Sequence, residues 1–151
     1  MTTNPHFEAA RSWDHATEML AFKPLEPKFT AGNRLQGLRI HVRDHKLREL
    51  ETVDRSLEAL YGAFVLSQAQ RGPSKARQLA LSTSYGPIGN DAQVVGHSAK
   101  TYELGPEVPP DDIDGRNPAV VTWHDGGMHY LIASNQLSIA ALAKIAASLY
   151  G

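Results

Sequence analysis

The chain has 151 residues, a length that suits one domain with its own core. Apolar residues make up 42% of it and charged residues 21%, which favours a globular fold over disorder. A formal net charge of −1 argues against nucleic-acid binding driven by bulk electrostatics. The chain contains no cysteine, which excludes disulfides, thiol catalysis and cysteine-based zinc sites.

The first third of the chain predicts a helix, an extended connector and a strand. Asn4-Pro5 is typical of a helix start, and residues at helical spacing follow it: Phe7, Ala10, Trp13, Thr17 and Leu20. We therefore expect a first helix of about four turns. The prolines in 22–29 exclude helix there and indicate an extended connector. Apolar and polar residues alternate over 38–43, which predicts a half-buried strand.

The middle of the chain is less clear. Residues 46–60 fit a helical stripe and also fit strand alternation towards Gly62, so the local pattern leaves both open. A strand is favoured for 63–69. Residues 93–104 predict another strand, in which Gly96 marks a bulge or a close backbone approach. The proline-rich and acidic stretch 105–118 predicts a solvent-facing loop.

The C-terminal part, 118–151, predicts a hairpin followed by a helix. Asp125-Gly126 is a strong hairpin signal because glycine accepts a positive φ. Apolar residues alternate on both sides of this turn. Ser138 then precedes a helical apolar stripe made by Ile139, Leu142, Ile145, Ala146 and Leu149.

Seven histidines raise the possibility of a metal or catalytic site: His6, His15, His41, His45, His97, His124 and His129. His41 and His45 would lie roughly 13 Å apart on one strand, too far to share an ion. His124 and His129 flank the hairpin turn and are placed to approach each other. With Asp125 they would make a weak exposed metal site at best, so we expect no metal, no cofactor and ordinary surface histidines.

Two aromatic residues on the hairpin complete the candidate site. Trp123 and Tyr130 are predicted to lie near each other across the hairpin, either as a ligand-stacking pair or as an ordinary cross-strand contact. The candidate ligand- or partner-binding residues are therefore Trp123, Tyr130, His124 and His129. No serine lies in a nucleophile elbow, and we expect no catalytic residues.

These segments resemble a known family. The run 120–132 and the helix end 144–149 resemble the end of a bacterial domain of unknown function. That domain often forms the extracytoplasmic part of anti-sigma factors and related lipoprotein-like proteins. Weaker similarities lie at 16–27, 60–68 and 94–96. The resemblance implies strands over 55–69 and a regulatory role, and it brings no catalytic residues.

We therefore expect a single α+β domain over 1–151, with a curved antiparallel sheet and the N- and C-terminal helices packed on one face. The favoured function is a noncatalytic sensing or interaction module that binds a protein or a small apolar ligand and forms a possible homodimer. The alternatives are a lipid- or peptide-carrier with an apolar pocket, and a hydrolase or metalloenzyme that uses His41, His97, His124 or His129.

Localisation stays open between two expectations. The sequence shows no secretory signal peptide and no apolar stretch long enough to span a membrane. The protein is expected in the cytoplasm if the chain is complete, and outside it if the chain is part of a membrane-anchored protein.

Overall fold

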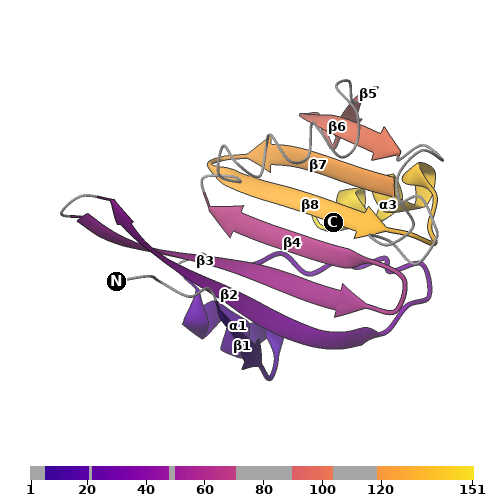
Figure 1. The fold of residues 1–151 in the computed structure, drawn as a ribbon. Coiled ribbons are helices and arrows are strands. Elements are labelled where there is room, and N and C mark those ends of the chain that lie inside the picture. Colours follow the sequence, from indigo (N-terminus) through magenta and orange to yellow (C-terminus); the bar gives the residue numbers. More distant parts are fainter. Residues whose placement is uncertain (1–5, 21, 48–49, 71–89, 104–118) are drawn as a thin grey trace.

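The computed structural model describes residues 6–20, 22–47, 50–70, 90–103 and 119–151. Within them, eight strands form one antiparallel sheet in the order β1-β2-β3-β4-β8-β7-β6-β5, accompanied by two short helices (Figure 1). The elements in chain order are β1 (His6–Ala10), α1 (Trp13–Met19), β2 (Leu35–Leu47), β3 (Leu50–Tyr61), β4 (Val65–Gln70), β5 (Asn90–Val94), β6 (His97–Glu103), β7 (Ala119–Asp125), β8 (Met128–Ser134) and α3 (Ile139–Ser148).

The expected α+β class is wrong, because the protein is mostly β. Helix α1 has 7 residues and α3 has 10, whereas β2 and β3 alone have 13 and 12. The expected first helix is shortened because its start pairs as a strand, and Leu50–Tyr61, in a stretch for which the local pattern left a helix open, is also a strand. None of the helices in the described part of the chain has the length and apolar content needed to cross a bilayer.

The N-terminal segment shows the first of these replacements. Instead of one helix from about residue 5, His6–Ala10 pairs with β2, and Phe7 lies opposite His41. The helix begins only after Ser12, whose Oγ accepts a hydrogen bond from the His15 backbone N at 3.0 Å. A free strand edge supplies backbone partners to any extended segment, and this pairing outweighs the modest helix preference of residues 6–10.

Of the residues 46–60, which the local pattern left open, those that the structure describes (46–47 and 50–60) lie in strands. Leu50–Tyr61 forms β3 and pairs with β2 over nearly its whole length. Leu57 and Ala59 are fully buried, and Tyr61 is 7% exposed, so alternate residues face the core. This confirms strands in the 55–69 region, apart from the turn between Tyr61 and Val65.

The core lies on one face of the sheet, beneath α3. Leu142, Ile145 and Ala146 of α3 are fully buried against this face. Figure 1 shows α3 at the end of the sheet that holds β7 and β8. The register places these buried sheet residues on the core face: Leu38, Ile40, Leu57, Ala59, Leu66, Gln68, Tyr130, Ile132, Val121 and Trp123.

Two tight hairpins organise the C-terminal half. The predicted hairpin between β7 and β8 is confirmed, with Gly126 and Gly127 as its turn residues at φ 56° and 83°. The expected strand over 93–104 is instead a hairpin of β5 and β6, and its turn residues Val95 and Gly96 have φ 48° and 82°. Two successive positive φ values are typical of the turn that matches strand twist. Gly96 therefore marks a turn and not a bulge.

Candidate functional site

The β7–β8 hairpin separates the four candidate residues into two pairs on opposite faces of the sheet. Trp123 lies opposite Tyr130, and His124 lies opposite His129. Neighbouring residues in a strand point to opposite faces, so the aromatic pair and the histidine pair cannot contribute to one site. The predicted approach within each pair is confirmed, but the four residues do not converge.

The aromatic pair belongs to the core. Trp123 is 1% exposed and Tyr130 is 5% exposed, and their rings stack with centroids 5.2 Å apart. The Trp123 indole N–H donates to the Tyr150 hydroxyl at 2.9 Å, which ties the sheet to the residues after α3. Of the two interpretations given by the sequence, the cross-strand packing contact is the one these contacts support.

Tyr150 is held in its neutral form. Burial raises its pKa from 10.0 to about 12, with the hydrogen bond from Trp123 lowering it and Asp125 raising it. Because the folded value exceeds that of an unfolded tyrosine, this contribution to stability is full below about pH 10 and is lost as the pH rises towards about 12. In a phenolate absorbance titration we expect Tyr150→Phe to remove one tyrosine from the late-titrating step. A variant whose late step kept its full amplitude would contradict this assignment.

The histidine pair forms a directed chain of hydrogen bonds on the opposite face. His124 Nε2 lies 3.3 Å from His129 Nδ1, and His129 Nε2 lies 3.1 Å from Thr122 Oγ1. Thr122 Oγ1 donates its own hydrogen to the Tyr130 carbonyl oxygen at 3.0 Å. It must therefore accept from His129 Nε2–H, which leaves a lone pair on His129 Nδ1. The network thus assigns the neutral Nε2–H tautomer to His129.

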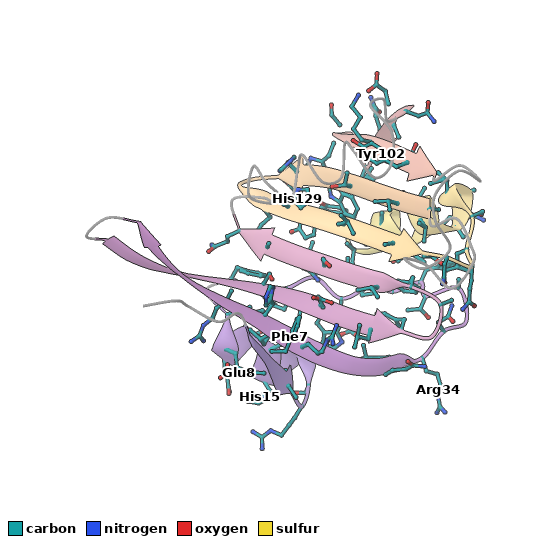
Figure 2. The ribbon with its side chains drawn as sticks, in the orientation of Figure 1. Phe7, Glu8, His15, Arg34, Tyr102 and His129 are labelled. Carbon is teal, nitrogen blue, oxygen red and sulfur yellow. The ribbon has the colours of Figure 1, made fainter. Side chains whose placement is uncertain are left out.

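Burial differs sharply between these two histidines. His129 is 8% exposed, so the expectation of a surface residue is wrong for it, whereas His124 is exposed as expected. Figure 2 labels His129 within the β7–β8 hairpin. The hydrogen bonds hold the buried His129 imidazole in one tautomer. The exposed His124 imidazole beside it leaves the pair accessible to solvent from one side.

The histidines proposed for catalysis do not gather in one place. His97 Nε2 lies 3.5 Å from Asp125 Oδ2, and the His97 ring packs against the Tyr150 ring. This places His97 on the face opposite His124 and His129. His41 stacks on Phe7 near the other end of the sheet. The side chains of His6 and His45 lie outside the described part of the structure. Across the residues that are described, no three His, Asp or Glu side chains form a group able to hold a metal.

A second cluster, which the sequence did not indicate, lies next to the β1 edge. Phe7 is 49% exposed and stacks on His41 with ring centroids 4.7 Å apart. The Arg39 guanidinium lies 4.5 Å from the Phe7 ring centroid and donates to Glu58 at 3.0 Å. We call Phe7, Arg39, His41 and Glu58 the Phe7 cluster. The register places it on the same face as the histidine pair.

The sequence pattern predicts the orientation of two members of this cluster but not the cluster itself. Arg39 and His41 alternate with the buried Leu38 and Ile40, which correctly predicts that both point away from the core. The spacing of Phe7 predicts only that it lies in the first helix. Only the pairing of β1 with β2 shows that it faces outward beside His41.

The chain was also compared with known proteins. No model of a protein family, no curated protein and no solved structure matches it. The resemblance to the anti-sigma-associated domain therefore stays a prediction from the residues quoted for it.

Proposed function

We propose that this protein is a noncatalytic interaction module that binds a protein partner through the Phe7 cluster. One observation carries the proposal. The half-exposed Phe7 ring lies on the edge strand β1 and is held in place by Arg39 and His41 of β2. Aromatic and arginine side chains are enriched in the centres of protein interfaces and dominate their binding energy.

The cluster is preorganised, which supports binding over chance exposure. Arg39 is fixed by Glu58 on one side and by the Phe7 ring on the other. A side chain that is already ordered loses less conformational entropy when a partner covers it. The adjoining strand β1 is an edge of the sheet, and a sheet edge offers backbone groups to an incoming extended segment.

The catalytic alternative receives less support from the same geometry. An acid–base site needs its groups within hydrogen-bond reach of one substrate atom. His97 and the pair of His124 and His129 lie on opposite faces. Thr122 adjoins His129 but donates its proton to a backbone carbonyl, so His129 is not placed to activate it. A link to anti-sigma-type regulation rests on the family resemblance alone.

Site-specific photocrosslinking tests the proposal. A benzoyl-phenylalanine at position 7 should give one dominant crosslinked protein in cells of the source organism, because the Phe7 ring would lie inside the interface. The matched control carries the same group at Phe29, another exposed phenylalanine, 37% exposed. Mass spectrometry identifies the adduct as either a second copy of the chain or a different protein.

Two results decide the outcome. A discrete adduct from position 7, absent from position 29 and abolished by Arg39→Ala, supports the proposal. Equal labelling from both positions, or none from position 7, contradicts it. Phe7→Ala itself should change the free energy of unfolding by less than about 1 kcal/mol, because so much of the ring is already in solvent.

A further inference from the structure

We propose that His124 and His129 form an open binding site for a divalent transition-metal ion of the Zn²⁺ and Cu²⁺ class. The two nitrogens that face each other, His124 Nε2 and His129 Nδ1, come from paired positions next to a tight turn. Both ligands are therefore held by the backbone of one hairpin, and this site is distinct from the Phe7 cluster.

The distance between the nitrogens matches shared coordination. Imidazole nitrogens bind Zn²⁺ at about 2.0–2.1 Å, and in a tetrahedral complex two such ligands lie about 3.3 Å apart. The observed separation of Nε2 and Nδ1 is 3.3 Å. An ion bound by both nitrogens would lie off the line of the present hydrogen bond, so both rings would rotate about their side-chain torsions to bind it.

The surroundings of His129 supply a second, independent observation. Metal-bound histidines almost always donate their other ring N–H to a fixed acceptor, which orients the ring. His129 Nε2–H has such an acceptor in Thr122 Oγ1, which is fixed in turn by the Tyr130 carbonyl. This buried network places the His129 lone pair on Nδ1, the atom that faces His124. His124 needs only to carry its hydrogen on Nδ1 to offer a second lone pair.

The site would be open and moderate in affinity. Among the described side chains it has two candidate ligands, so water or a ligand from outside would complete the coordination. On the neighbouring strands, Lys100 lies opposite Thr122 and Asp91 lies opposite Lys100, and these two side chains form an ion pair. Two imidazoles favour Cu²⁺ over Ni²⁺ and Zn²⁺ and discriminate against Mg²⁺ and Ca²⁺.

Thermal unfolding with added ZnCl₂ or MgCl₂ tests the site in the intact chain. At a zinc concentration about 100-fold above Kd we expect Tm to rise by about 5–10 °C, with no rise in magnesium. His124→Ala, a change at an exposed position, should abolish the zinc response. His97→Ala, on the opposite face, should keep it.

NMR locates the ion independently of stability. Zinc should shift the imidazole resonances of His124 and His129 and leave those of His15 and His97 unchanged. The proposal is overturned if His124→Ala keeps the full rise in Tm, if His97→Ala removes it equally, or if the two hairpin histidines do not respond. These outcomes are independent of the crosslinking at position 7, so either proposal can fail alone.

Discussion

Trp123→Ala should lower the free energy of unfolding by about 3–5 kcal/mol, the range for removing a large aromatic side chain from a core. The ring is 1% exposed and stacks on Tyr130. Its removal leaves a cavity beneath α3 and deprives the Tyr150 hydroxyl of the indole donor. Chemical denaturation monitored by circular dichroism measures the loss.

Trp123→Phe separates the two parts of this effect. It keeps an aromatic ring against Tyr130 and removes the hydrogen bond to Tyr150, so we expect a loss clearly smaller than that of alanine. The exposed Phe29 provides the surface control, and Phe29→Ala should cost less than about 1 kcal/mol. An alanine variant at 123 as stable as the Phe29 control would show that the hairpin does not pack beneath α3.

Gln68→Ala is the second large effect, expected to cost about 2–4 kcal/mol. Gln68 is fully buried, and its Oε1 accepts from the Leu25 N–H at 2.8 Å. Its Nε2 donates to the Leu25 carbonyl at 2.7 Å. One side chain thus satisfies both backbone groups of a connector residue, as a neighbouring strand would. Without it, both backbone groups of Leu25 lose their partner at a partly buried position.

The matched control is Gln93→Ala, because Gln93 is exposed on the edge strand β5. It should leave the unfolding transition within about 0.5 kcal/mol of the wild type. Hydrogen exchange adds a local readout, since the Leu25 amide should exchange faster in Gln68→Ala. Equal stability of the two variants, or unchanged exchange at Leu25, would contradict the bridging role of Gln68.

The C-terminal unit was the most predictable part of this fold. Two local signals identify this unit: apolar and polar residues alternate around Gly126, and Ser138 precedes an apolar helical stripe. Tertiary contacts reinforce both signals. They predicted both the hairpin and α3. Local alternation also predicts which residues share a face. Trp123 and His124 are neighbours in sequence, so their separation onto two faces follows from the strand prediction itself.

The N-terminal part could not be predicted in the same way. Phe7 and Ala10 fit a helix by spacing, and only a partner strand about thirty residues away makes this segment extended. The fold class failed for the same reason, since strand pairing at both His6–Ala10 and Leu50–Tyr61 is nonlocal. The hydrogen bonds between Gln68 and Leu25 could not be predicted from local sequence either, because the two residues are 43 positions apart in the chain.

One NMR measurement on the metal-free protein tests the central claim, which is that the β7–β8 hairpin has a structural face and a separate histidine-bearing face. Long-range ¹H–¹⁵N spectra report both the histidine tautomers and the exchange of the indole N–H groups. We expect the Nε2–H tautomer for His129 and slow exchange at the Trp123 indole. The Nδ1–H tautomer for His129, together with an indole that exchanges as fast as free tryptophan, would contradict it.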